Sequence, residues 1–206
     1  RTYYNNRYSN KCWYNGNTMS SLNVNTIGEY TSGNGVTIDS LLIKDGSING
    51  LITEADHFRL DTSLTASANP IGGANFDRND SISGMTGAKV GTGMSVDSTG
   101  HWTFPSTGIY LVQMKANISF SAYSGGYIYL YGTVDNGSNW TLIQNANSQA
   151  QTNYDVGEPQ LSSILDIQDT SNYKVYFRFY DEGSATLRGS SSSSHTTVSF
   201  IRLGDT

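Results

Sequence analysis

The amino-acid sequence predicts an all-β protein, a two-sheet jelly-roll sandwich preceded by a short glycine-rich β-stalk. Residues 108–120 follow a turn at Pro105 and alternate apolar and polar side chains with a period of two, as a half-buried strand does. Similar strands recur to the C-terminus without a convincing helix between them. Only 14% of the residues are charged, whereas Gly, Ser, Thr and Asn are abundant, which favours tight turns and neutral strand faces.

The first 20 residues have neither a helical nor a strand period, yet they are rich in aromatic side chains. Aromatic residues at this density favour a segment that docks on another protein over an ordinary solvated tail. A floppy end is the alternative, and the sequence leaves both open. The segment also lacks the apolar core of a signal peptide. Its aromatic residues are Tyr3, Tyr4, Tyr8, Trp13 and Tyr14.

Residues 21–57 carry short apolar clusters that are separated by glycine turns such as Asp45-Gly46 and Asn49-Gly50. Clusters of this length are too short to build a sandwich alone. They favour a narrow β-stalk that buries its apolar side chains against two other copies around a common axis. The apolar positions are Leu22, Val24, Ile27, Val36, Ile38, Leu41, Ile43, Ile48 and Ile52.

Residues 58–206 have the pattern of a sandwich, with strands divided by turn signals such as Asp135-Asn-Gly137 and Asp181-Glu-Gly183. About ten strands in this length match the size of a two-sheet jelly roll. Strands are expected near 57–61, 74–76, 93–97, 101–104, 108–120, 126–134, 139–145, 161–166, 173–180, 184–188 and 195–203.

Two of these strands carry tyrosines on the face opposite their aliphatic or phenylalanine side chains. Tyrosine buries a large ring and keeps a polar tip, so such a face favours contact with protein over contact with bulk water. The alternative is that the tyrosines lie on a solvated sheet. The predicted trimer interface consists of Tyr127, Tyr129, Tyr131, Tyr176 and Tyr180.

Three further aromatic residues lie near the ends of expected loops. Tyr123 and Tyr154 are predicted to contact a ligand, because exposed aromatic rings beside polar turns can stack on sugar rings. Trp140 is expected to fill the core at the start of a strand.

Several classes of chemistry are disfavoured by the sequence. A net charge of −5 gives no general attraction to nucleic acid, and no segment has the apolar length of a membrane span. His57, His101 and His195 lack the spacing of a zinc site, and no nucleophile elbow or nucleotide-binding loop occurs. The carboxylates near Asp135 and Asp181 suit either a calcium site or simple β-turns. We therefore predict no catalytic residue, no metal ligand and no cofactor.

Residues 91–112 contain a strand, a Phe-x-x-Pro-x-x-Gly-x-Tyr turn and the start of a long strand, and this run resembles the signature of C1q/TNF-like trimeric heads. The ending Thr196–Asp205 looks like the closing strand of that fold. Residues 31–46 are similar to a module found ahead of such heads in fibre and structural proteins of phages and other viruses. The resemblance implies a C1q/TNF-like jelly-roll head over residues 58–206 in a homotrimeric virion protein.

The resemblance implies a non-enzymatic tail-fibre or surface protein for host attachment, located on the virion surface or outside the cell. Its expected partners are its own copies, another virion protein bound through residues 1–20, and a host surface glycan or protein. A capsid or tail decoration or assembly protein with the same fold is the alternative. A glycan-processing enzyme is the third hypothesis, although no pair of acidic residues has a convincing context.

Overall fold

The computed structural model describes residues 36–38, 41–44, 47–48, 52–78, 89–151 and 155–206. The chain forms two compact units, Arg1–Asn49 and Gly50–Thr206. The predicted docking segment, residues 1–20, and the predicted loop residue Tyr154 lie outside the described residues.

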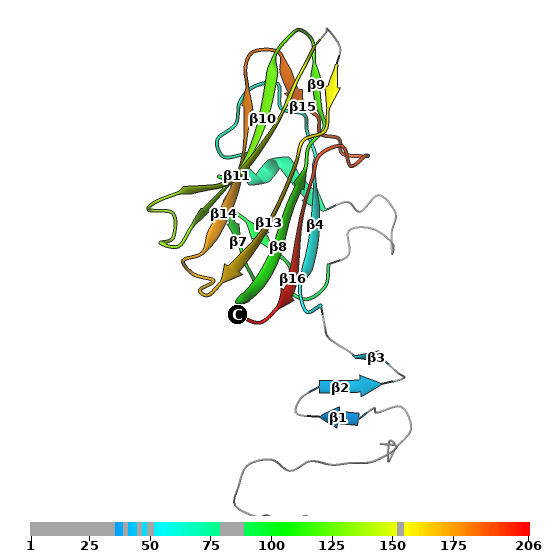
Figure 1. Ribbon diagram of the computed structural model, residues 1–206, viewed down its shortest axis with the longest axis vertical. Coiled ribbons are helices and arrows are strands. Elements are labelled where there is room, and N and C mark those ends of the chain that lie inside the picture. The colour runs from blue at the N-terminus through cyan, green and yellow to red at the C-terminus, as the bar shows by residue number, and fades with distance from the viewer. Residues whose placement is uncertain (1–35, 39–40, 45–46, 49–51, 79–88, 152–154) are drawn as a thin grey trace, which may run out of the picture. The chain divides into compact units, whose positions relative to one another are not determined.

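The first unit contains a small antiparallel sheet of three short strands (Figure 1). The strands are β1 (Val36–Ile38), β2 (Leu41–Lys44) and β3 (Ser47–Ile48), in that order across the sheet. Short strands between turns are what the sequence predicts for this segment. Its packing against other copies stays a prediction.

The second unit is a sandwich of two five-stranded antiparallel sheets, as predicted (Figure 1). The first, here called the β10 sheet, has the strand order β11-β10-β14-β7-β6. Its strands are β11 (Thr141–Gln149), β10 (Gly125–Thr133), β14 (Lys174–Asp181), β7 (Trp102–Thr103) and β6 (Ser95–Val96).

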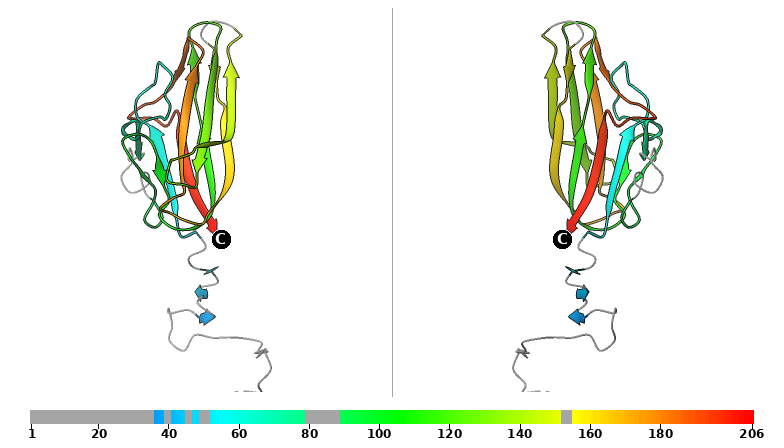
Figure 2. Two further views of the ribbon diagram at one scale, coloured as in Figure 1. Left: turned by 90° about the vertical axis from the view of Figure 1, so that its left-hand side faces the viewer. Right: turned by 90° about the vertical axis from the view of Figure 1, so that its right-hand side faces the viewer.

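The second sheet, here called the β8 sheet, has the strand order β13-β8-β16-β4-β5. A smaller sheet, β12-β9-β15, and one short 3-10 turn, η1 (Gly73–Asn75), complete the unit. Figure 2 shows the long strands of the sandwich from two opposite sides. The remaining strands are β13 (Gln160–Ile167), β8 (Gly108–Lys115), β16 (Thr197–Gly204), β4 (Ala55–Leu60), β5 (Phe76–Arg78), β12 (Val156–Gly157), β9 (Ile118–Phe120) and β15 (Ala185–Leu187).

The long strand predicted over residues 108–120 is divided in the structure. β8 ends at Lys115 and β9 begins at Ile118, and the two strands pair in different sheets. Between them the backbone N–H of Ala116 donates to the carbonyl of Pro159, and that of Asn117 donates to Thr196 Oγ1. These two bonds satisfy the backbone where the chain leaves one sheet for the next. The apolar period continues across the break, so the sequence alone does not reveal it.

Other predicted boundaries also differ from the structure, two of them in ways that bear on the architecture. The strand expected at 74–76 is largely the turn η1, and β5 starts at Phe76. β4 begins at Ala55, so residues 55–57 of the predicted stalk range belong to a strand of the sandwich.

The core lies between the two five-stranded sheets and is centred on Trp102, which is fully buried. Phe58, Phe76 and Phe200 pack against its indole, with ring centroids 4.7, 5.2 and 5.0 Å away. Edge-on and tilted contacts of this kind add stability beyond the burial of area. The structure confirms the predicted inward-facing side of residues 108–120, which is Tyr110, Val112, Met114, Ala116, Ile118 and Phe120.

Candidate functional site

The outer surface of the β10 sheet carries the five tyrosines that the sequence singles out, together with Arg178. Ile128, Leu130 and Phe177 of the same strands are fully buried, so alternation turns their neighbours outward. We call this surface the tyrosine face. In the strand register, Tyr127 lies opposite Tyr180, Tyr129 opposite Arg178, and Tyr131 opposite Tyr176.

The side chains of the tyrosine face contact one another. The rings of Tyr131 and Tyr176 are stacked, with centroids 4.9 Å apart and an interplanar angle of 14°. The centroid of Tyr127 lies 5.9 Å from that of Tyr180 and 6.4 Å from that of Tyr129. Cross-strand aromatic pairs of this kind stabilise a sheet. The five tyrosines therefore form one continuous array rather than separate exposed rings.

Trp140 and His101 extend this array at one side. The Trp140 ring packs edge-on against Tyr176 at 4.7 Å between centroids, and His101 stacks on Trp140 at 4.8 Å. Trp140 is half-buried on the outer surface, so the prediction that it fills the core is wrong. Trp140 comes directly before β11. Its apolar contact is with the outward ring of Tyr176 and not with the core between the sheets.

Arg178 lies at the centre of the tyrosine face. Its guanidinium carbon is 5.1 Å from the centroid of Tyr129 and 5.6 Å from that of Tyr180. Both contacts are within the range of cation–π attraction. Sequence reasoning did not single out Arg178, although its position two residues from Tyr176 and from Tyr180 places it on the same face.

Burial affects the titration of two phenols of this face. It raises the pKa of Tyr129 above its ordinary value, and the charge of Arg178 opposes this shift. Burial also raises the pKa of Tyr176. The hydroxyl of Tyr127 donates a hydrogen bond of 3.0 Å to Glu182 Oε1. The face therefore offers aromatic rings and neutral hydroxyl groups around one cation.

The outer surface of the β8 sheet carries a row of aliphatic side chains that the sequence analysis missed. Ile164 pairs with Leu111, Leu111 with Ile201, and Ile201 with Ala55. An isolated bridge joins Ala55 to Val90. We call these five residues the aliphatic row. Its signal in the sequence is Leu111, which with Ile109 makes one half of the outward side of its strand apolar, while Gln113 and Lys115 make the other half polar.

The aliphatic row is open to solvent at both ends. Ile164 is 66% exposed and Val90 is 46% exposed. Leu203 and Ile52, both about half exposed, add to the apolar side chains of this unit that lie outside its core. Contiguous exposed apolar side chains mark interaction surfaces in soluble proteins.

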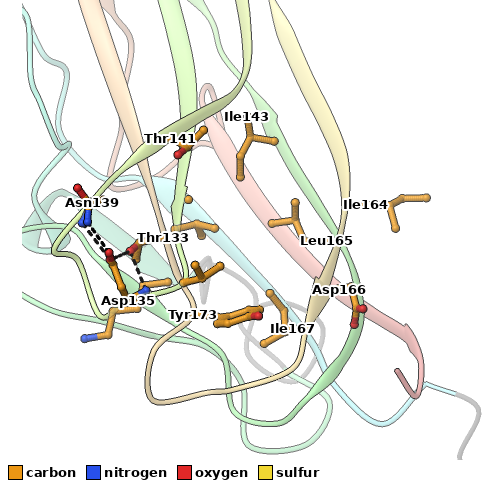
Figure 3. A pocket seen from close by; sticks show the side chains of 14 residues that line it. Thr133, Asp135, Asn139, Thr141, Ile143, Ile164, Leu165, Asp166, Ile167 and Tyr173 are labelled. Carbon is orange, nitrogen blue, oxygen red and sulfur yellow. Dashed lines mark hydrogen bonds between the residues drawn. The ribbon is translucent and has the colours of Figure 1, made fainter.

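A pocket of about 360 Å³ opens between β11 and β13, the edge strands of the two sheets (Figure 3). Ile143, Leu165, Ile167 and Tyr173 supply apolar walls, and Ile164 belongs both to the pocket and to the aliphatic row. The pocket therefore adjoins the exposed apolar surface of the β8 sheet.

Asp135, on the polar side of the pocket, closes a turn. Its carboxylate accepts hydrogen bonds from Thr133 Oγ1 at 2.6 Å and from Asn139 Nδ2 at 2.6 Å. These bonds lower the pKa of Asp135 to about 2. Asp181 likewise accepts bonds of 2.7 Å from the backbone N–H groups of Gly183 and Ala185. The contacts are those of the β-turn alternative.

The remaining predicted residues lie apart from one another. Tyr123 is 75% exposed in the connection between β9 and β10. His57 contacts Ser199, with 2.8 Å between Nδ1 and Oγ, whereas His101 lies on the other sheet beside Trp140. In the described residues no three His, Cys, Asp or Glu side chains are grouped as a metal ion would require. Among the same residues, no helix has the length and apolar character to span a membrane.

Comparison with known proteins identifies the fold. The sequence matches no protein-family model and no curated protein. Among solved structures, Eiger TNF from S. frugiperda is similar with a TM-score of 0.56 and 13% identity, over 76% of this chain and 96% of that one. Murine APRIL is similar with a TM-score of 0.52 and 9% identity, over 73% of this chain and 98% of that one. The chain therefore contains a TNF-like jelly-roll sandwich, as the residues of the 91–112 motif predict.

Proposed function

We propose that this protein is a non-enzymatic, self-associating virion surface protein, of the tail-fibre type, whose jelly-roll head serves attachment to a host cell. The observation that carries the proposal is the apolar character of the outer sheet surfaces, which a solitary head leaves in water. The resemblance of residues 91–112 to trimeric heads favours three copies around one axis. The 31–46 module supports a virion protein, located on the virion surface or outside the cell.

Two surfaces compete as the contact between copies. The predicted interface is the tyrosine face. The aliphatic row is a second candidate, and a specific observation favours it: its end residues Ile164 and Val90 are 66% and 46% exposed, whereas on the tyrosine face Tyr176 is 8% exposed and Tyr180 is 38% exposed. Side chains that already contact one another gain less from a second copy than side chains that face water.

A ring of copies suits the aliphatic row and the adjoining pocket. The row and the pocket are different surfaces of one head that share Ile164. Contact between one surface and a different surface of the next copy generates a closed ring when the rotation closes. Three heads that bind one surface together raise the overall avidity about a hundredfold or more above the affinity of a single weak contact.

Attachment is the finer part of the proposal. Tyr123 and Tyr154 are proposed as loop contacts to a host surface glycan or protein, and residues 1–20 as the contact to another virion protein. The second candidate function is a capsid or tail decoration or assembly protein, in which the head stabilises a particle and binds no receptor. The exposure of Tyr123, which leaves three quarters of its side chain in water, favours attachment.

The mass of the full chain tests self-association. Light scattering on the purified chain at micromolar concentration is expected to give three times the chain mass of 22.4 kDa. A one-chain mass would contradict both the attachment and the decoration proposals. Attachment is tested by the binding of the labelled chain to intact host cells. If the double variant Tyr123→Ala, Tyr154→Ala keeps its mass and loses binding, the proposed loop contacts are supported. If its binding is unchanged, the proposal that these two residues contact the host is wrong.

A further inference from the structure

The outward side of β14 carries two cations, Arg178 of the tyrosine face and Lys174, that no carboxylate of the described residues neutralises. Arg59, Arg78, Lys115 and Arg202 each form an ion pair with an acidic side chain. Arg178 and Lys174 form none within the described residues, although both point outward from β14. This local positive charge contrasts with the net charge of −5 for the whole chain.

Arg178 also has an unused hydrogen-bond donor. Its Nε atom is buried and has no hydrogen-bond partner among the described residues. A buried donor without a partner costs free energy, and more so when it is part of a charged group. The guanidinium plane is held by the rings of Tyr129 and Tyr180. Arg178 is therefore a fixed cation whose capacity for hydrogen bonding is only partly used.

Polar amides flank the rings of the tyrosine face. Asn147 lies opposite Tyr127 and Asn145 lies opposite Tyr129 in the pairing of β11 with β10. Both asparagines are exposed, and neither side chain has a hydrogen-bond partner in the described residues. A side-chain amide offers two donors and one acceptor, which suits a ligand that carries many hydroxyl groups.

We propose that the tyrosine face binds an acidic glycan, a chain of sugar rings that bears carboxylate or sulfate groups. The anionic group lies on Arg178, where a planar guanidinium can donate two parallel hydrogen bonds. The sugar rings pack on the neighbouring tyrosines, because the electron-rich face of an aromatic ring attracts polarised C–H groups. Asn145 and Asn147 bind hydroxyl groups. The inference rests on the proposed attachment function, and it names the ligand class and a second surface for it.

The charges around the face disfavour a nucleic acid. Glu182 lies at one end of the face beside Tyr127, and Asp97 lies beside His101 at the other side. A single-stranded nucleic acid carries a charge at every phosphate and requires a continuous cationic groove. One central guanidinium flanked by acidic groups suits an anion that recurs at wider intervals along a chain of hydroxyl-bearing rings.

The test measures binding of the full chain to four probes: short oligomannuronate, a heparin oligosaccharide, neutral dextran and oligo-dT. We expect binding of oligomannuronate, of the heparin fragment, or of both, and the pair distinguishes carboxylate from sulfate. The variant Arg178→Gln is expected to weaken that binding about tenfold, the effect of losing a hydrogen bond to a charged group. Lys115→Gln removes the same charge from the β8 sheet and is expected to leave binding within about twofold of wild type.

The outcomes separate this inference from the proposed function. No binding to either acidic oligosaccharide, equal binding to dextran, or tighter binding to oligo-dT overturns the glycan site. Equal loss in Arg178→Gln and Lys115→Gln also overturns it, because the charge alone would then be responsible. A drop in mass caused by Arg178→Gln would show that the face joins copies instead. The double variant Asn145→Ala, Asn147→Ala gives a second measurement at exposed positions, with the same expected loss. A one-chain mass together with unchanged glycan binding would contradict the proposed trimer and would still support the glycan site.

Discussion

The two outer sheet surfaces of the sandwich are both rich in apolar side chains, but they differ in what those side chains contact. On the β10 sheet, Tyr131, Tyr176 and Trp140 pack on one another, and Arg178 lies over two more rings. On the β8 sheet, the outermost member of the aliphatic row, Ile164, leaves two thirds of its surface in water. An outward apolar residue therefore indicates a missing partner only when its own neighbours do not cover it.

The comparison assigns different tasks to the two surfaces. Aliphatic side chains have no directional chemistry, so the aliphatic row selects only for a matching apolar surface, such as another copy. The tyrosine face combines rings, hydroxyl groups and a cation, which is the composition of a surface that recognises a polar ligand. Four substitutions or conditions test this division.

The largest effect is expected from a charge in the aliphatic row. Ile164→Glu places a carboxylate where a second copy would bury it, and the dissociation constant of the oligomer is expected to rise about a hundredfold or more. Light scattering across a concentration series measures the change. Val156→Glu is the matched control, because Val156 is 52% exposed on β12, away from the row. Retention of the wild-type mass by Ile164→Glu would exclude the row as the contact between copies.

The next effect concerns the stability that the tyrosine face gives to a single head. Tyr176→Ala is expected to lower the free energy of unfolding by about 2 kcal/mol, because the ring is buried and packs against Tyr131 and Trp140. Tyr180→Ala, at an exposed position of the same strand, is expected to cost about 0.5 kcal/mol or less. Urea unfolding in the Ile164→Glu background removes the contribution of self-association. Equal costs at both positions would mean that the burial of Tyr176 between Tyr131 and Trp140 adds no stability beyond that of an exposed ring of the face.

Much of the sandwich follows from the sequence, because a strand with one buried face has a period of two. The period of residues 108–120 places Tyr110 to Phe120 in the core, and the same rule brings five tyrosines to one surface. The period does not report which partner a strand has. For this reason the break between β8 and β9, where Ala116 and Asn117 bond to different segments, is invisible in the sequence.

The functional surfaces are harder to predict, since they depend on cross-strand neighbours that lie far apart in the chain. The aliphatic row joins Ile164, Leu111, Ile201, Ala55 and Val90, each an unremarkable residue in its own segment. Trp140 is similar: its place on the outer surface is set by Tyr176 in another strand. Local alternation places Arg178 on the side of Tyr176 and Tyr180, but its lack of an ion pair within the described residues is visible only in the folded chain.

A smaller effect is expected from Arg178→Gln in the absence of ligand. Loss of its cation–π contacts with Tyr129 and Tyr180 removes about 0.5–1 kcal/mol, and removal of the buried Nε without a hydrogen-bond partner offsets part of this. Urea unfolding is therefore expected to change little, while glycan binding falls about tenfold. A stability loss of about 2 kcal/mol or more would instead make Arg178 a structural residue of the sheet.

The smallest expected effect is a difference in pH dependence between the stability of the head, to which the tyrosine face contributes, and self-association through the aliphatic row. Because burial raises the pKa of Tyr129 and of Tyr176, the folded chain holds these protons to a higher pH than the unfolded chain. Their contribution to stability is thus complete below the ordinary tyrosine pKa of about 10 and is lost as the pH rises through the folded values. Tyr129→Phe is expected to make stability decline less steeply above about pH 10. Burial also raises the pKa of Tyr110, and this contribution is the same in the wild type and the variant. Self-association through the aliphatic row involves no ionisable side chain of the row itself, so its dissociation constant is expected to stay constant over the part of this range in which the head remains folded. A dissociation constant that follows the tyrosine titration, and loses that dependence in Tyr129→Phe, would move the contact between copies from the aliphatic row to the tyrosine face.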